Sequence, residues 1–199
     1  MSRKVWMWAG IVVGVVVVSW LSLSAYYLNA ENGLCNTEWG VLNAAYHDRA
    51  AIIPGLAGTV RSVALYDGRD YGSLKSAEAA VASYTYSGDE LVTDDPSSFE
   101  QYVQTQRELT SAIYTIIGIG RDDPTLRYDA GFVDLQNVLA VNAARIERAK
   151  RRYDDAARIY NDSRKSFPDV VIAKLLGNDF RAKGMFAEHN GAKKAKPAT

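Results

Sequence analysis

The sequence predicts an all-α protein in which an N-terminal transmembrane helix precedes an antiparallel, up-and-down bundle of about four helices. The first observation behind this prediction is an uncharged apolar run over residues 5–28. The second is a 3.5-residue period over residues 135–168, which is typical of one long helix that buries a narrow stripe against partner helices, as in a coiled coil. Its positions are Leu135, Leu139, Asn142, Ile146, Ala149, Tyr153, Ala156, Tyr160, Ser163 and Phe167.

Three segments are expected along the 199 residues: a membrane anchor over 1–28, a helical bundle over 29–188 and a disordered basic tail over 189–199. The formal net charge is zero, which argues against a general nucleic-acid-binding protein, because such proteins usually carry a strong basic excess. Nucleic acid is therefore not an expected partner.

The apolar run over residues 5–28 is long enough to span a bilayer. At about 1.5 Å per residue it reaches roughly 36 Å, against a hydrocarbon core of about 30 Å. Trp6 and Trp8 lie near one end, and Tyr26 and Tyr27 near the other, where aromatic rings favour the membrane interface. A cleaved signal peptide is the alternative, but its apolar region is usually only about 7–15 residues long. The lipid bilayer is thus the expected partner of residues 5–28.

The charges that flank this run predict its orientation. Arg3 and Lys4 precede it, whereas residues 29–48 contain no lysine or arginine. The positive-inside rule then places the N-terminus in the cytoplasm and the bundle on the extracytoplasmic side. The expected location is the inner, cytoplasmic membrane or a compartment membrane derived from it.

The first bundle helix should begin near Asn36 or Thr37, after a break at Asn32–Gly33. Arg49 occupies the one polar position of its apolar stripe, and Pro54 should kink the helix without ending it. The stripe comprises Trp39, Leu42, Tyr46, Ile53, Leu56, Val60 and Val63, and it resumes at Leu74, Ala77, Val81 and Tyr84.

Residues 87–98 are rich in Gly, Asp, Ser and Pro and predict a loop. Ser97 or Ser98 should cap the next helix, and Gly118 and Gly120 should end it. Residues 121–125 predict a second loop. Pro168 should end the main helix, because it lacks an amide hydrogen and excludes α conformation at Phe167. Residues 170–176 predict a short last helix. The stripe of the helix before Gly118 comprises Phe99, Tyr102, Gln106, Leu109, Ile113 and Ile116.

Two stretches carry a resemblance to a known family. The pattern LQ…RI…AK..YDDA…YN…FP within residues 135–168 resembles the C-terminal signature of the LemA family, and residues 39–60 are similar to its first signature. The resemblance implies a bacterial, membrane-anchored antiparallel bundle of about four helices without established enzymatic activity. The chain departs from the family at Ala143, where a glutamate is common, and at Asp154, where asparagine is usual.

The sequence contains none of the common catalytic or metal-binding motifs. It has no glycine-rich phosphate loop, no G-x-S-x-G and no H-E-x-x-H. Its two histidines, His47 and His189, lack the Glu-x-x-His spacing of metal sites in bundles. Cys35 is the single cysteine, so no intrachain disulfide can form. We expect no enzymatic activity, no catalytic residue, no cofactor and no bound metal.

Four aromatic residues on two of the predicted stripes, Trp39, Tyr46, Tyr153 and Tyr160, allow two interpretations. They form either a pocket for a hydrophobic ligand or core rings whose polar atoms reach hydrogen-bond partners, with Asp154 and Asn161 as candidates. The core interpretation is favoured.

Arg145, Arg148 and Arg152 fall together on one side of the main stripe. They are a candidate interaction surface for a protein partner or lipid headgroups. The alternative, which is favoured, is internal pairing with the acidic first half of the bundle, because residues 29–100 carry a net charge of −7 and residues 101–199 one of +5. The acidic residues considered for this pairing are Glu78, Asp89, Glu90, Asp94 and Asp95.

These observations together predict a non-enzymatic, single-pass membrane protein that presents a helical bundle as an interaction or scaffolding module. Its expected partners are the bilayer and unidentified protein, including a second copy of the chain. A role in membrane organisation, or in forming a magnetosome-like membrane compartment, lies within the range of the family. The alternative is a small-molecule or lipid sensor with an aromatic pocket between helices.

Overall fold

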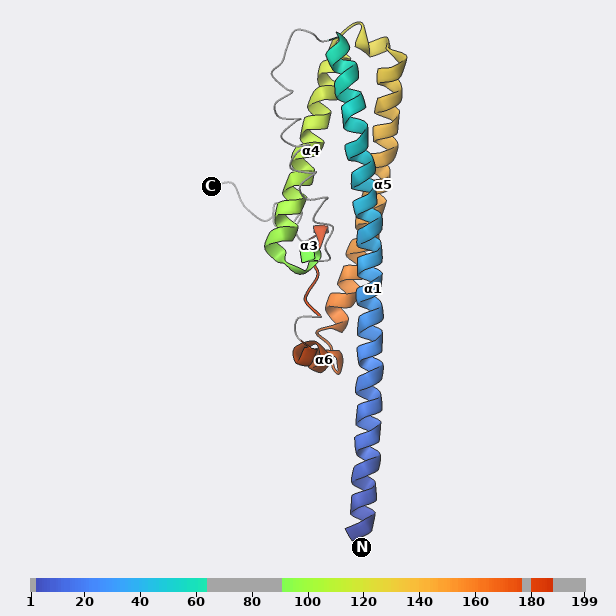
Figure 1. Ribbon diagram of the computed structural model, residues 1–199, viewed down its shortest axis with the longest axis vertical. Coiled ribbons are helices and arrows are strands. Elements are labelled where there is room, and N and C mark those ends of the chain that lie inside the picture. The colour runs from blue at the N-terminus through green and yellow to red at the C-terminus, as the bar shows by residue number, and fades with distance from the viewer. Residues whose placement is uncertain (1–2, 64–90, 177–179, 188–199) are drawn as a thin grey trace.

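The computed structural model describes residues 3–63, 91–176 and 180–187. Every secondary-structure element within these ranges is a helix, as predicted, and no strand occurs there. Helix α1 runs the length of the molecule, and helices α4 and α5 lie beside its C-terminal half (Figure 1). The stripe expected at Leu74, Ala77, Val81 and Tyr84 and the tail expected over residues 189–199 lie outside the described residues.

Helix α1 (Arg3–Val63) is one continuous helix of 61 residues. It continues through Pro54, as predicted, but the expected break at Asn32–Gly33 is wrong. Glycine costs roughly 1 kcal/mol in a helix interior. Here Leu28 and Cys35, on either side of the pair, are both buried in the core, and their packing offsets that cost. The apolar run and the first bundle helix are therefore a single rod.

The N-terminal part of α1 is the one helix among the described residues that is long and apolar enough to cross a membrane. Residues 6–20 are exposed. From Leu21 onward other parts of the chain cover the helix: Ser24 donates a hydrogen bond to the Asp169 carboxylate, and Leu28 is fully buried. The Trp20 and Phe167 rings also meet edge to face, 5.1 Å apart. The bundle thus begins to pack before residue 28, the boundary expected from hydropathy.

The predicted loop over residues 87–98 contains a helical turn, α3 (Leu91–Asp94), and the start of α4 (Pro96–Asp122). The N-cap of α4 is Asp95, not Ser97 or Ser98. Its carboxylate accepts hydrogen bonds from the Ser98 amide at 2.8 Å and the Ser97 hydroxyl at 2.6 Å. Proline suits the first turn of a helix, because its missing amide hydrogen has no partner there. The predicted apolar stripe of α4 is buried throughout.

Helix α4 continues past Gly118 and Gly120, so the prediction that these glycines end the helix is wrong. The 3₁₀ helix η1 (Leu126–Tyr128) then leads to α5 (Ala130–Ser163), whose N-cap Asp129 accepts a hydrogen bond from the Phe132 amide at 2.8 Å. A side chain at Gly120 would overlap the Phe132 ring, which is fully buried. Glycine is required there for close packing of α4 on α5.

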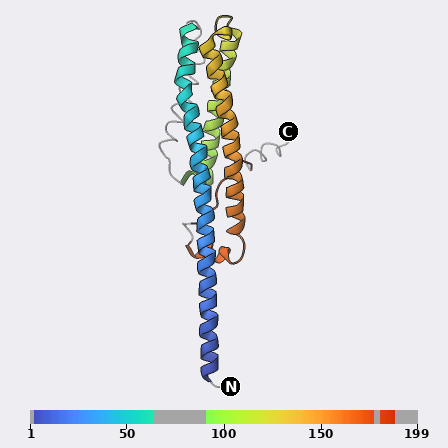
Figure 2. The ribbon, with the colours of Figure 1, turned by 90° about the vertical axis from the view of Figure 1, so that its right-hand side faces the viewer.

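Helix α5 buries the predicted stripe from Leu139 to Tyr160, and it packs antiparallel against α1 (Figure 2). It ends at Ser163, so the predicted extension to Phe167 is wrong, and Phe167 is 70% exposed. Residues 164–168 turn the chain back toward α1, which places α6 (Asp169–Leu176) beside it. The short last helix is confirmed.

The buried apolar side chains of the described residues form two clusters. The first contains Trp39, Tyr102 and Tyr153, and the second contains Ile53, Leu109 and Phe132. Asn142 lies between them on α5, and its side-chain amide donates to the Ala45 carbonyl at 3.0 Å. This bond fixes the axial position of α5 on α1, the role expected of a polar residue in an apolar stripe.

The two glycines of α4 provide a test of the α4–α5 contact. Gly120→Ala should cost about 1–3 kcal/mol of unfolding free energy, because the buried Phe132 ring would have to move. Gly118→Ala should be neutral or stabilising by up to about 1 kcal/mol, since no atom outside its own helix lies within 4 Å of the added carbon. Chemical denaturation of the full chain in detergent measures both. Equal effects of the two substitutions would contradict the close contact.

Candidate functional site

A layer of polar side chains separates the two core clusters. Arg49 of α1, Gln106 of α4 and Asn142 of α5 are all more than nine-tenths buried. The Arg49 guanidinium donates to the Thr110 hydroxyl at 2.6 Å, to the Gln106 side-chain oxygen at 2.6 Å and to the Gln106 carbonyl at 3.3 Å. Each long helix thus contributes at least one polar group to this layer.

Arg49 has no acidic partner among the described residues. Its guanidinium lies 4.9 Å from the centre of the Tyr46 ring, and its Nε atom is buried without a hydrogen-bond partner. Desolvation by burial lowers the pKa of Arg49, and nearby tyrosines, with Tyr46 first, oppose this shift. Transfer of a charge from water into a protein is costly unless it is paired. Among the described residues, the Arg49 cation is compensated only by neutral groups.

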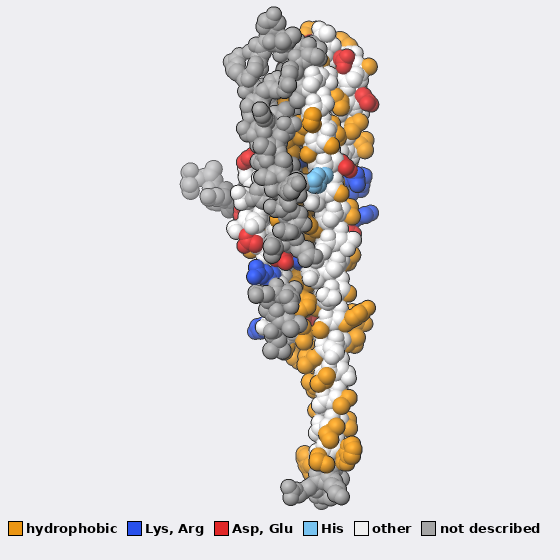
Figure 3. All heavy atoms as spheres, viewed as in Figure 1, with side chains coloured by type: hydrophobic (Ala, Val, Ile, Leu, Met, Phe, Trp, Pro, Cys, Tyr) orange, Lys and Arg blue, Asp and Glu red, His pale blue; other side chains and the backbone are white. Residues whose placement is uncertain are grey.

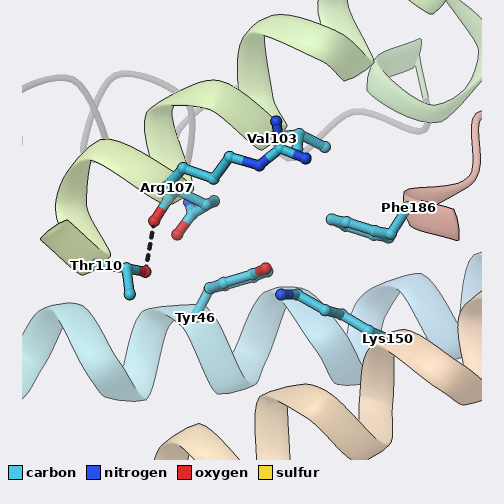
Figure 4. Close-up of a pocket in the computed structure, with 7 residues that line it drawn as sticks. Tyr46, Val103, Arg107, Thr110, Lys150 and Phe186 are labelled. Atoms are coloured by element: carbon cyan, nitrogen blue, oxygen red, sulfur yellow. Dashed lines mark hydrogen bonds between the residues drawn. The ribbon is translucent and has the colours of Figure 1, made fainter. Parts of the chain in front are cut away.

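One pocket is lined by Gln106 of the polar layer, and a second by Arg49. The first has a volume of about 200 Å³, and Figure 4 shows Tyr46 reaching into it between α4, α5 and the C-terminal Phe186. The second has a volume of about 150 Å³ and is lined by Arg49 together with apolar side chains of α4 and α5. Thr110 lines both pockets, and its hydroxyl donates to the Gln106 carbonyl at 2.7 Å.

The four aromatic residues singled out in the sequence are all buried in the first core cluster. The Trp39 ring lies 5.3 Å from Tyr153 and 5.0 Å from Tyr102, and the Tyr153 hydroxyl donates to the Gly184 carbonyl at 2.8 Å. Tyr46 also lines the first pocket. Burial raises the pKa of Tyr46, Tyr153 and Tyr160. Both interpretations of the four aromatic residues stay predictions.

Asp154 and Asn161 were predicted to bond the polar atoms of the aromatic residues, and this prediction is wrong. They hold residues 180–187 against α5 instead. Asn161 makes two hydrogen bonds to the backbone of Lys183, at 2.8 and 2.9 Å. The Asp154 carboxylate accepts from the amides of Phe186 and Ala187, at 2.8 and 3.0 Å, while burial raises its pKa. These side chains therefore fix the C-terminal segment.

Lys183 connects this segment to the rest of the bundle, and sequence reasoning missed it. Its side chain is only 2% exposed, and its ammonium lies 2.6 Å from the Asp94 carboxylate and 3.0 Å from the Asn36 side-chain oxygen. The ion pair joins the C-terminal segment to α3, and the hydrogen bond to Asn36 joins it to α1. A lysine beside Arg181 in the sequence carries no local signal of burial, because its partners lie far away along the chain.

The candidate interaction surface divides into two parts. Arg145 forms an ion pair with Asp48 of α1, whereas Arg148 and Arg152 are exposed and form no ion pair with the described residues. Of the acidic partners considered, Asp94 pairs with Lys183 and Asp95 caps α4; Glu78, Asp89 and Glu90 lie outside the described residues. Figure 3 shows basic side chains at the α5 edge of the bundle.

Cys35 is buried, with 1% of its surface exposed. Desolvation raises the pKa of its thiol to about 11, so the thiol stays neutral near pH 7 and is shielded from water-soluble reagents.

Among the described residues, no three His, Cys, Asp or Glu side chains gather as a metal site.

A comparison with models of known protein families gives a match. The sequence model of the LemA family matches residues 38–199. No curated protein matches the sequence.

The ion pair between Lys183 and Asp94 should show an asymmetry. Asp94→Asn leaves the buried ammonium without a counter-charge and should cost about 3–5 kcal/mol. Lys183→Met should cost less, because the Asp94 side chain is 19% exposed and keeps contact with water. Chemical denaturation of the full chain in detergent measures both. As a control, Lys150→Met breaks a partly exposed pair with Glu147 and should cost at most about 1 kcal/mol. The reverse order of the first two losses would contradict the buried network.

Proposed function

The chain belongs to the LemA family, and we propose that it is a non-enzymatic, single-pass membrane protein whose helical bundle is a scaffold for protein partners at the membrane surface. In this proposal the apolar run over residues 5–28 anchors the chain in the inner membrane, or in a compartment membrane derived from it, and its exposed residues 6–20 contact the lipid. The bundle faces the extracytoplasmic side, and its task is membrane organisation, including the formation of a membrane compartment.

The continuity of α1 carries this proposal. A single helix connects the apolar run to the core of the bundle, without a linker. The turn after α5 and helix α6 brace the same helix at Trp20 and Ser24. A bundle attached in this way keeps one orientation relative to the bilayer, which suits a scaffold that presents a fixed surface. A flexible tether would instead let the bundle reorient freely.

Helix α5 offers the surface for a partner. Arg148 and Arg152 are exposed and unpaired within the described part of the chain, and Val141, one turn before Arg145 on the same face, is 69% exposed. Two positive charges beside exposed apolar side chains suit an acidic protein surface. The alternative function, a sensor built on the aromatic rings, stays a prediction.

The orientation can be tested with a cysteine at Gly40, which is exposed and has no atom beyond its own helix within 4 Å of the added carbon. A membrane-impermeant maleimide should label Gly40→Cys in intact cells whose outer membrane, if present, has been permeabilised. The wild type should stay unlabelled, because Cys35 is buried. Ser2→Cys should react only after the inner membrane is opened. The opposite pattern would place the bundle in the cytoplasm.

The scaffold proposal can be tested with a photo-crosslinking amino acid at Val141. In native membranes it should give a discrete protein adduct. Arg148→Gln with Arg152→Gln should reduce this adduct several-fold, and more strongly at low salt, because exposed charges are screened. The unfolding free energy should change by less than about 0.5 kcal/mol, as for most surface substitutions.

Arg151→Gln with Arg158→Gln is the matched control, because it removes two exposed charges from other faces of the same helix. It should leave the adduct intact. Absence of any adduct, or one that all variants form equally, would contradict a docking surface on α5.

A further inference from the structure

We propose that the second pocket, beside Arg49, binds a small amphipathic monocarboxylate, with the carboxylate at Arg49 and the apolar body between α4 and α5. None of the residues of the candidate interaction surface, Arg145, Arg148 and Arg152, lines this pocket. The ligand proposal therefore does not depend on the scaffold proposal.

The first argument is the missing counter-charge. Arg49 is 7% exposed, and its hydrogen bonds go to a hydroxyl, an amide oxygen and a backbone carbonyl. Its Nε hydrogen has no acceptor among the described residues, but that atom is fully buried, so a ligand in the pocket would meet the guanidinium at its terminal nitrogens. Guanidinium groups match carboxylates through two parallel hydrogen bonds, and such charge-assisted bonds are about twice as strong as neutral ones. A carboxylate would therefore supply the partner that the described protein groups do not.

The second argument is the character of the pocket. Its volume of about 150 Å³ equals that of an engineered protein cavity that binds benzene. Ile113, Ile117 and Leu139 form apolar walls. Arg121 and Gln136, which bond each other at 2.9 Å, are the polar groups at an exposed edge of the lining. This size fits one short or aromatic acid, and it excludes a peptide or an entire phospholipid.

The third argument is electrostatic. The neighbouring pocket is lined by Arg107 and Lys150, and it shares Thr110 with the second pocket (Figure 4). Among the described residues, no aspartate or glutamate lines either pocket. A positive potential at a cleft with low-dielectric walls attracts anions. The apolar walls favour a single charge with an apolar body over a doubly charged phosphate, whose desolvation is more costly.

Ala143 makes the proposal testable, because it lines the same pocket as Arg49. Ala143→Glu would place a carboxylate of the protein itself where the ligand is proposed to bind. Ala144→Glu is the matched control: it adds the same charge one residue further along, at an exposed position outside this pocket lining. Benzoate is the probe, and benzyl alcohol is its uncharged counterpart.

The full chain in lipid nanodiscs is titrated with each compound, and binding is followed by calorimetry and by the melting temperature. Benzoate should bind and raise the melting temperature of the wild type and of Ala144→Glu, and benzyl alcohol should bind at least ten-fold more weakly. Ala143→Glu should melt higher than the wild type without ligand and lose at least ten-fold in benzoate affinity.

If Ala143→Glu does not fold, Ala140→Phe replaces it, because Ala140 lines the pocket and the larger side chain would fill the space while leaving Arg49 intact. This variant should also lose at least ten-fold in benzoate affinity. No benzoate binding by the wild type at millimolar concentration would overturn the proposal. Equal affinity for benzoate and benzyl alcohol, or equal benzoate affinity in the wild type and the pocket variants, would overturn it as well.

Discussion

The antiparallel contact between α1 and α5 is the interaction on which the rest of the structure depends. Its register is marked by three polar contacts between described residues of the two helices. Ser163 donates to the Glu31 carboxylate, Arg145 pairs with Asp48, and the Asn142 side chain donates to the Ala45 carbonyl. In the proposed topology, α1 also has to suit two environments. Its first part exposes apolar side chains to lipid, and its second part buries one narrow stripe. Because both parts belong to one helix, the register on α5 also sets how far the bundle stands from the bilayer.

The polar layer shows that core stability and specificity are supplied by different residues. The two apolar clusters could slide along the helices, since an apolar contact has little directional preference. Asn142, Arg49 and Gln106 limit this freedom, because their hydrogen bonds are satisfied in only one register. The cost is a buried guanidinium compensated by neutral groups and an Asn142 oxygen without a partner. Because these partners of Arg49 are neutral, its positive charge is available to the anionic ligand that we propose.

The C-terminal segment closes the bundle without regular secondary structure over most of its length. Residues 181–185 form neither helix nor strand, so their backbone groups need other partners. Side chains of α5 provide some of them: Asn161 bonds the amide and carbonyl of Lys183, and the Tyr153 hydroxyl donates to the Gly184 carbonyl. Asp154 accepts from the next amides, at Phe186 and Ala187, and the Lys183 ammonium anchors the segment to Asp94. Phe186 completes the aromatic cluster against Phe99 and Tyr153. The proposed scaffold is rigid for this reason: α1 is held by α5 along one side and linked to the C-terminal segment through Asn36.

The residue pattern was enough to predict the helical class, the apolar anchor candidate and most buried positions of the long helices, including Arg49 and Asn142. Periodicity reports which face of a helix is apolar, and this information is local. The ends of α4 and α5 depend on tertiary contacts. Gly120 stays inside α4 because its close contact with the Phe132 ring leaves no room for a side chain. The turn at residues 164–168 is stabilised by segments that follow it, as in the hydrogen bond from Arg164 to the Phe180 carbonyl. The polar partners were equally beyond the sequence. Arg49 meets Gln106 across 57 positions and Lys183 meets Asn36 across 147, and a pattern confined to one helix carries no information about such distant neighbours.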